Sequence, residues 1–372
     1  MNTKQIQNKC RGSLIGGAIG DALGYAVEFS SLSEIRKKYG EKGITDYELN
    51  SDGIAEFSDD TQMSLFTADG LLSGIAAGKT SDKDILFYIT TAYEHWYYTQ
   101  CPPPLKMRNS WLTHIMSLWA RRAPGSTCMS ALQTISMPNR ALVVNNSKGC
   151  GGVMRVAPIG IFSASHPKQL DLEQAGYLAG YAADITHKHP LSTHSSMALA
   201  MIVADCIAND YIDREKFRFI VMSRAFKLLS SYFKEDSYLM ELQTLIEKAL
   251  DLAASDRSDT DAILMLGEGW VAEETLAIAI FSVMRHLDDF EKCIRCAVNH
   301  DGDSDSTGAV AGNIIGAILG YQAIPEKYLT NLELHDVLLS VADDLGGFSR
   351  PEQMKERYVN HQPFNVNKDF LL

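Results

Sequence analysis

The sequence has no excess of basic residues. Lysine and arginine together number 34 against 46 aspartates and glutamates, so the formal net charge is −12 at pH 7. Sequence-independent nucleic-acid binding needs a basic surface that neutralises phosphates, and attraction to anionic lipids needs the same sign of charge. The charge balance therefore predicts that neither nucleic acid nor a membrane is a partner.

Long uncharged apolar runs are also missing. Residues 11–27 begin with a basic residue and continue with small and apolar ones, as a signal peptide does, but Asp21 interrupts the run. No other stretch reaches the 18 or so uncharged apolar residues that a transmembrane helix needs. Seven cysteines in 372 residues are too few, and odd in number, for a disulfide scaffold. These features predict a cytoplasmic protein with reduced thiols.

Strand patterns are scarce as well. Residues 44–49 and 141–144 are the best candidates for short extended pieces, whereas apolar residues recur every three or four positions through most of the chain. Helices are expected over 61–77, 84–98, 110–121, 172–184, 192–208, 215–233, 238–254, 272–286, 290–298 and 306–321. The turn clusters between them are too short for interdomain linkers. The pattern predicts one all-α domain over residues 1–372, with its motifs within 11–323 and elaborations over 96–145 and 210–262.

Two segments carry a glycine at every fourth position: Gly12, Gly16, Gly20 and Gly24, and Gly308, Gly312, Gly316 and Gly320. On a helix this spacing places the four glycines along one stripe. Each costs about 1 kcal/mol of helix propensity relative to alanine, so a compensating gain is expected. Close approach of two buried central helices would supply it, and the alternative is that each stripe makes separate tight contacts.

Two acidic clusters each stand before a helical pattern. Residues 58–61 read SDDT, and residues 303–307 read DSDST. Aspartate and serine are common N-caps, but a cap needs only one side chain. Neighbouring buried carboxylates repel unless a cation lies between them, and hard oxygen ligands suit Mg²⁺, Mn²⁺ or Ca²⁺. The two clusters together could hold two such ions.

Three further features carry weaker signals. The glycine-rich segment 145–155 ends in an arginine and could hold a phosphate, although it matches neither the P-loop nor the Rossmann pattern. The histidines at 187, 189 and 194 have no matching cysteine pair, so contact with a ligand is favoured over zinc. Cys293 and Cys296 form a CxxC within a helical pattern, which favours two buried helix residues over a zinc or redox pair.

Six motifs follow one another in the order found in a known family: 12–28, 58–61, 151–158, 185–187, 267–276 and 301–308. On them the chain resembles the ADP-ribosylglycohydrolases. The resemblance implies an all-α hydrolase that removes ADP-ribose from modified proteins at a centre of two Mg²⁺ or Mn²⁺ ions. The implied metal ligands are Ser58, Asp59, Asp60, Asp303, Asp305 and Ser306.

The resemblance also implies the remaining roles. Catalysis is assigned to Glu28, Asp60 and Asp303, with either Glu28 or a metal-bound carboxylate taking the proton of the attacking water. The residues assigned to the substrate are Gly149, Gly151, Gly152, Met154, Arg155, His187 and Trp270, with Trp270 or a nearby tyrosine as the candidate to stack on the adenine. The DSDS form of the second cluster resembles members that act on ADP-ribosylated arginine. Some relatives neutralise ADP-ribosyltransferase toxins, so such a toxin is a second candidate partner.

Two alternatives to this hydrolase are considered. A binding protein that sequesters a transferase or its modified target would have the same fold, although the complete ligand set argues against it. An isoprenoid synthase also uses acidic clusters, but residues 59–63 lack the last acid of its DDxxD motif. Residues 96–119 would form either a lid or partner-binding face, or a second layer of helices.

Overall fold

The computed structural model describes residues 1–102, 110–137 and 141–360, and within these ranges the chain is built from helices. No strand forms there, and the extended pairing amounts to isolated bridges between Ala55 and Leu332 and between Gly149 and Val271. The all-α prediction is confirmed, whereas 44–49 and 141–144 form no strand.

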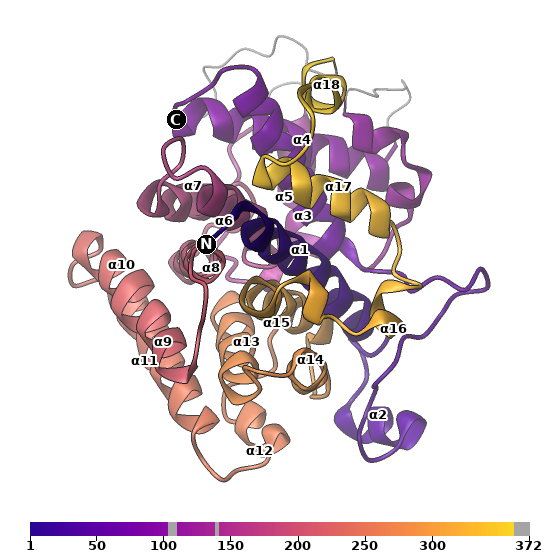
Figure 1. Cartoon of the computed structure of the whole chain (residues 1–372), viewed down its shortest axis with the longest axis vertical. Coiled ribbons are helices and arrows are strands. Elements are labelled where there is room, and N and C mark those ends of the chain that lie inside the picture. The colour runs from indigo at the N-terminus through magenta and orange to yellow at the C-terminus, as the bar shows by residue number, and fades with distance from the viewer. Residues whose placement is uncertain (103–109, 138–140, 361–372) are drawn as a thin grey trace.

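The α-helices are α1 (Thr3–Tyr25), α2 (Leu32–Tyr39), α3 (Asp59–Ala76), α4 (Asp82–Gln100), α5 (Ser126–Ser136), α6 (Ala157–Ser165), α7 (Leu172–Asp184), α8 (Pro190–Ala208), α9 (Arg214–Arg218), α10 (Lys227–Tyr232), α11 (Ser237–Ala253), α12 (Asp259–Leu264), α13 (Ala272–Arg285), α14 (Phe290–Val298), α15 (Ser304–Leu319), α16 (Glu326–Leu329), α17 (His335–Gly346) and α18 (Pro351–Met354). Helices α1 and α15 lie side by side at the centre of the molecule (Figure 1).

The two glycine stripes face each other across the α1–α15 contact. A Cβ atom on Gly16 would lie 2.5 Å from the carbonyl oxygen of Gly312, and one on Gly20 would overlap the carbonyl oxygen of Gly308. Only glycine permits this backbone approach. The prediction of two adjacent central helices is therefore confirmed.

The pairing of these helices is antiparallel, and this positions the acidic clusters. Gly12 lies against Gly316, whereas Gly24 lies against Ser304, so the end of α1 meets the beginning of α15. Ser13 and Asn313 fix the register with two hydrogen bonds, in which each side chain donates to the other residue's backbone carbonyl, at 2.8 and 2.9 Å. The turn that follows α1 is thereby brought to the DSDS segment.

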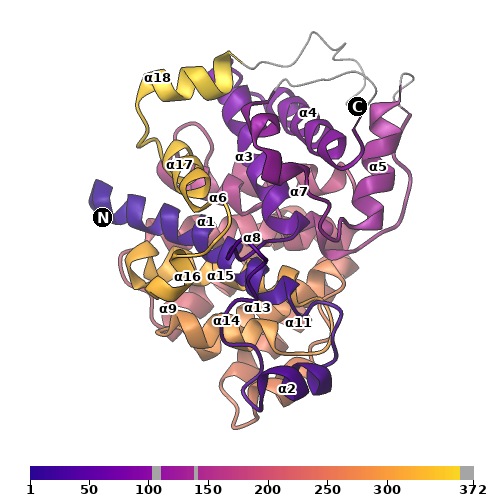
Figure 2. The same cartoon turned by 90° about the vertical axis from the view of Figure 1, so that its right-hand side faces the viewer.

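Other helices surround this pair. Helix α2 lies at one end of the molecule and α18 at the other (Figure 2). Helix α8 is long and apolar enough to cross a membrane by length and composition, but 89% of its apolar window is buried inside the protein. It is a core helix, against which α6 and α7 pack. The predicted cytoplasmic location stays a prediction.

Two predicted helices differ in detail from the structure. Residues 110–121 form two short 3₁₀ turns, Trp111–His114 and Met116–Trp119. In the first turn the Ser110 side chain accepts from Leu112 N–H at 3.1 Å, and such local bonds compete with a regular helix. The 215–233 segment passes through a π-helical stretch, Phe219–Phe226, between α9 and α10. The division into a core and two elaborations stays a prediction.

Candidate active site

The acidic clusters lie at the first turns of α3 and α15. Ser58 is the N-cap of α3 and accepts from Asp60 N–H at 3.2 Å, while Asp303 caps α15 and accepts from Ser306 N–H at 3.3 Å. Capping thus accounts for one side chain in each cluster. The remaining members, Asp59, Asp60 and Asp305, are buried carboxylates that capping does not explain.

Asp21 holds the first cluster in place. This fully buried residue of α1 accepts from the backbone N–H of Ser58 at 2.8 Å and from that of Thr61 at 2.9 Å. From the sequence, Asp21 was interpreted as a charge that interrupts an apolar run, and it was assigned no role at the site. Asp21 is a lone carboxylate on a glycine-striped core helix, and this pattern indicates that the carboxylate has a buried hydrogen-bond partner.

Glu28 joins the second cluster from the turn after α1. One carboxylate oxygen each from Glu28, Asp303 and Asp305 lie within 4.8 Å of one another. Burial and the nearby Asp305 carboxylate raise the pKa of Glu28 to about 10. The same two causes raise the pKa values of Asp59, Asp60 and Asp303 well above the usual aspartate range.

This arrangement fits a divalent cation. The Glu28 Oε2 and Asp60 Oδ2 atoms are buried and have no hydrogen-bond partner among the described residues. Buried like charges with free oxygens are stabilised by an ion between them, and an all-oxygen donor set suits Mg²⁺ or Mn²⁺. The described residues therefore form a group able to hold such a metal, without fixing its identity or number.

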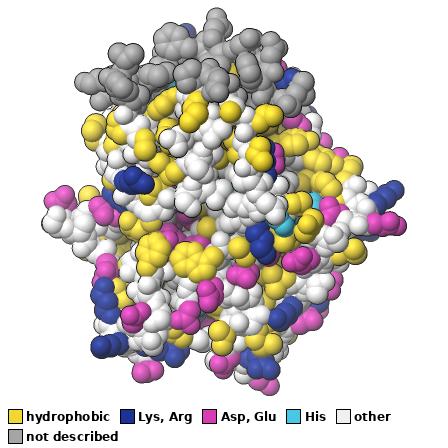
Figure 3. Space-filling view, turned by 180° about the vertical axis from the view of Figure 1, so that it is seen from behind, with side chains coloured by type: hydrophobic (Ala, Val, Ile, Leu, Met, Phe, Trp, Pro, Cys, Tyr) yellow, Lys and Arg dark blue, Asp and Glu magenta, His cyan; other side chains and the backbone are white. Residues whose placement is uncertain are grey.

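The clusters form the floor of a cleft with a volume of about 410 Å³. Most of the predicted site residues line it: Glu28, Asp59, Asp60, Gly149, Gly151, Met154, His187, Trp270, Asp303, Asp305 and Ser306. Cys150 and Phe29 also line the cleft and were not singled out from the sequence. On the face shown in Figure 3, lysine and arginine side chains are scattered among acidic and apolar ones in the described part of the chain.

Ser58, Gly152 and Arg155 do not line the cleft. Ser58 is fully buried behind it, and Gly152 lies against the Ser192 side chain. Arg155 was expected to contact a phosphate, but it is fully buried, with its guanidinium 4.4 Å from the centre of the Tyr93 ring. Its position thus differs from the expected one, because its donors are directed into the core.

Arg155 is instead connected to His187 through Thr186. Its Nη2 donates to the Thr186 hydroxyl at 2.7 Å, and that hydroxyl lies 2.8 Å from His187 Nδ1. Burial and the charge of Arg155 lower the pKa of His187 to about 3, so the imidazole is neutral at physiological pH. Gly151 gives the ring room, since a Cβ there would lie 2.8 Å from His187 Cε1.

The other two histidines of the 187–194 cluster have structural contacts. His189 caps α8 by accepting from Leu191 N–H at 3.1 Å, and His194 packs against Phe233. Neither lines the cleft. Of the cluster, only His187 faces the candidate site.

Two exposed aromatic rings stand at the cleft. Phe29 and Trp270 stack with a centroid separation of 6.1 Å and an interplanar angle of 23°. Their side chains remain 75% and 40% exposed. Glu274 fixes the loop that carries Trp270, because its Oε2 accepts from the N–H groups of Glu268 and Gly269 at 3.1 and 3.2 Å. Flat apolar surface is thus presented beside the carboxylates.

The fold and cleft define an all-helical protein with a buried carboxylate centre at the ends of its two central helices. A model of the family described as ADP-ribosylglycohydrolase matches residues 2–353, so the chain belongs to the ADP-ribosylglycohydrolase family. An uncharacterized protein of Archaeoglobus fulgidus is 28% identical, with 91% of this chain and 96% of that protein covered.

Relatives with assigned names are similarly distant. The ADP-ribosyl-[dinitrogen reductase] glycohydrolase of Rhodospirillum rubrum is 25% identical over 90% of this chain and 93% of its own. The ADP-ribosylarginine hydrolase Tri1 of Serratia proteamaculans is 24% identical over 91% and 79%. A solved structure titled "ADP-ribosylglycohydrolase-related protein complex" superposes with a TM-score of 0.63 at 22% identity, over 93% of this chain and 100% of that one. This likeness shows the fold.

Proposed function

We propose that this member of the family is a metal-dependent hydrolase that removes ADP-ribose from arginine side chains of modified proteins. The observation that carries the proposal is the convergence of Glu28 with the two acidic clusters on the floor of one cleft. Family membership and the printed names of the relatives from R. rubrum and S. proteamaculans support the reaction class.

Two Mg²⁺ or Mn²⁺ ions would be held by Ser58, Asp59 and Asp60 on α3 and by Asp303, Asp305 and Ser306 on α15. When bound, such ions offset the charge of these carboxylates and polarise the oxygen atoms of the substrate beside them. Asp21 keeps the first set of ligands in register through Ser58 and Thr61.

The reaction exchanges one bond for another. A water oxygen bonds to C1″ of the ribose, the bond from C1″ to the guanidine nitrogen breaks, and one proton of the water ends on that nitrogen. The products are ADP-ribose and unmodified arginine. Glu28 is placed to move this proton, because it lines the cleft and its Oε2 has no partner among the described residues. Asp60 and Asp303 are the other candidates for this role.

The central loop is proposed to hold the rest of the ligand. Gly149 and Gly151 bring the loop close to His187, whose neutral ring can exchange a hydrogen bond with a phosphate or ribose oxygen. Met154 lies beneath Ser306, with 4.0 Å between its sulfur and the serine hydroxyl. Gly152 and Arg155 support these residues from behind.

The aromatic pair supports arginine as the modified residue. A guanidinium is planar and cationic, and it stacks favourably on an aromatic face. Phe29 and Trp270 offer such a face beside buried carboxylates, at a place where a protein side chain can enter from solvent. The partner in this proposal is an ADP-ribosylated protein, and a toxin is not part of it because no described feature favours one.

The test is release of ADP-ribose from a protein modified on arginine, with Mg²⁺ and with EDTA, beside a serine-linked substrate. We expect release from the arginine substrate that EDTA removes and that Asp303→Asn reduces at least about 100-fold. Release from serine alone would contradict the arginine linkage, and release unchanged by EDTA would contradict metal dependence. A binding protein would retain the modified substrate without release, and Asp303→Ala would retain it equally well.

A further inference from the structure

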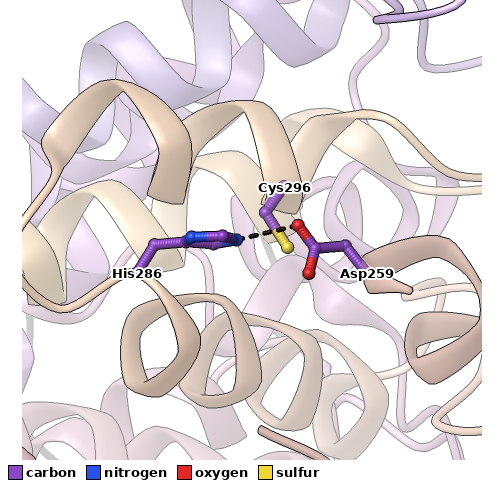
Figure 4. Close-up of side chains that lie close together, drawn as sticks. All are labelled: Asp259, His286 and Cys296. Atoms are coloured by element: carbon purple, nitrogen blue, oxygen red, sulfur yellow. Dashed lines mark hydrogen bonds and ion pairs between the residues drawn. The ribbon is translucent and has the colours of Figure 1, made fainter. Parts of the chain in front are cut away.

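Three side chains with metal-binding chemistry meet outside the cleft. Asp259 begins α12, His286 follows the last residue of α13, and Cys296 lies on α14. One donor atom from each lies within 4.8 Å of the other two. His286 Nε2 and the Asp259 Oδ2 atom are 2.8 Å apart, and the Cys296 sulfur lies beside the same carboxylate (Figure 4).

The cluster is accessible to an ion. All three residues line a surface depression of about 320 Å³. The side chains of His286 and Asp259 are 19% and 38% exposed, whereas Cys296 is buried. An ion can therefore enter the depression from solvent and reach the buried Cys296 thiol that lines it.

We propose that Asp259, His286 and Cys296 bind one Zn²⁺ ion, with a water as the fourth ligand. Nitrogen, sulfur and carboxylate oxygen donors in one group suit zinc, whereas the carboxylates and hydroxyls of the two acidic clusters suit Mg²⁺ or Mn²⁺. In a tetrahedral zinc site the donor atoms lie roughly 3.3–3.8 Å apart, as follows from bond lengths of about 2.0–2.3 Å. The 2.8 Å contact between His286 and Asp259 has to open slightly to reach this spacing.

Neighbouring groups support the three ligands. The Ser282 hydroxyl, which donates to the Ile278 carbonyl at 2.9 Å, lies 3.4 Å from the Cys296 sulfur, and Arg285 Nη1 lies 3.9 Å from the Asp259 Oδ1 atom. Hydrogen bonds and charges of this kind orient ligands and favour a deprotonated sulfur. Zinc binding at the buried thiol would release its proton to solvent.

Four basic side chains line the depression, Arg36, Lys42, Lys292 and Arg295, and the last two are paired with acids. Lys292 lies 2.9 Å from Asp289, and Arg295 lies 3.9 Å from Glu291 on the same helix. In the zinc-bound state, the Cys296 thiolate and the Asp259 carboxylate would together balance the charge of the divalent ion.

A catalytic cysteine is less well supported by the same residues. His286 directs Nε2 to Asp259 rather than accepting the proton of the thiol. Burial and the Asp259 carboxylate raise the pKa of Cys296, which disfavours a thiolate nucleophile in the absence of a metal. Cys293, the other half of the CxxC, is fully buried one turn earlier and is not part of the cluster.

Zinc at this position would link α12, α13 and α14, which are the helices around and after the Trp270 loop and before the second acidic cluster. It would fix α12 to α13, which begins directly after the Trp270 loop, and to α14, which precedes Asp303. The ion would therefore hold together the segment between the aromatic pair and the second acidic cluster, without touching substrate.

The test uses the purified full-length chain, stripped of metal with a chelator and titrated with Co²⁺ in the presence of excess Mg²⁺. We expect one equivalent of Co²⁺ to give a thiolate charge-transfer band and the visible bands of a tetrahedral ion, both removed by Zn²⁺. Cys296→Ser and His286→Gln are each expected to weaken Zn²⁺ binding more than about 100-fold, because loss of an outer partner alone costs 10–100-fold.

Two cysteines serve as matched controls. Cys293→Ser removes the adjacent thiol of α14, and Cys150→Ser removes the thiol beside the cleft carboxylates; both variants should keep the band. Absence of the band in the wild type, its survival in His286→Gln, or its loss in Cys150→Ser would overturn the proposal. Circular dichroism checks folding, and if Cys296→Ser does not fold, the partly exposed His286→Gln decides the result.

Discussion

Asp21 accepts a hydrogen bond from the backbone N–H of Ser58, so the central helix α1 directly sets the position of the first acidic cluster. A second bond, from Thr61 N–H, ends on the other oxygen of the same carboxylate. Substitution by asparagine keeps the shape but turns one acceptor into a donor.

We therefore expect Asp21→Asn to lower the free energy of unfolding by about 1–3 kcal/mol, because a buried N–H loses its acceptor. Mg²⁺ affinity should fall at the same time, since the start of α3 shifts. Thermal melts and calorimetric Mg²⁺ titration measure the two effects. Asp210→Asn is the control and should change neither measurably, because the exposed Asp210 side chain makes a 3.6 Å surface ion pair with the N-terminal amine.

The glycine stripes predict a sharp dependence on position. Gly20→Ala would place a methyl group on the carbonyl oxygen of Gly308 and should destabilise the protein by several kcal/mol, or prevent folding. Gly74→Ala in α3 meets only ordinary contacts at 3.5 Å and should be neutral or stabilise by up to about 1 kcal/mol. Equal melting temperatures for the two variants would show that the stripe is not a close-packed contact.

The Arg155–Thr186–His187 chain predicts a positioning role. Thr186→Val keeps the volume but removes the hydroxyl that contacts both neighbours. We expect affinity for ADP-ribose to fall about tenfold, corresponding to loss of one hydrogen bond to a charged group. Calorimetry with ADP-ribose measures this fall, and unchanged affinity in a folded variant would disprove the positioning role.

The aromatic pair predicts selective loss of substrate recognition. Trp270→Ala should lower kcat/KM for arginine-linked substrate by about 5–30-fold, the equivalent of one or two kcal/mol of cation–π contact. Binding of free ADP-ribose should change little, because the ring is assigned to the arginine. Trp270→Phe should restore most of the rate. If the affinity for free ADP-ribose fell by the same factor, Trp270 would contact the ADP-ribose part of the ligand instead of the arginine.

His95 predicts a pH effect on stability. This residue of α4 is buried, which lowers its pKa from 6.5 to about 4. The unfolded chain therefore takes up a proton before the folded one, and stability falls as the pH drops from about 6.5 to 4. The difference is worth at most about 3 kcal/mol. His95→Gln should flatten this part of a plot of unfolding free energy against pH. An unchanged slope would show that other titratable groups cause the loss of stability.

Local patterns in the sequence predicted much of the fold. Helices α7, α13 and α14 end within one residue of the expected bounds, and the glycine spacing indicated the α1–α15 contact. The 3₁₀ turns at 111–119 were missed because the apolar spacing there resembles a helix, and only the hydrogen bonds of Ser110 and its neighbours show otherwise.

For the site, the residues involved were easier to predict than the direction in which each side chain points. The carboxylates were identified because their number exceeds what capping requires. Arg155 was misplaced because an arginine beside a glycine-rich loop looks the same in sequence whether it faces a ligand or the core. The link from Asp21 to Ser58 and the Asp259–His286–Cys296 cluster join residues up to 37 positions apart, and no local periodicity in the sequence indicates such contacts.

The antiparallel contact of α1 with α15 also has a consequence for biosynthesis. Gly20 is synthesised 288 residues before Gly308, its contact partner on α15. At about 5–20 residues per second the interval is tens of seconds, and contacts between distant segments form slowly. Until α15 has been made, the glycine face of α1 lacks its partner, so the acidic centre is completed only at a late stage of synthesis.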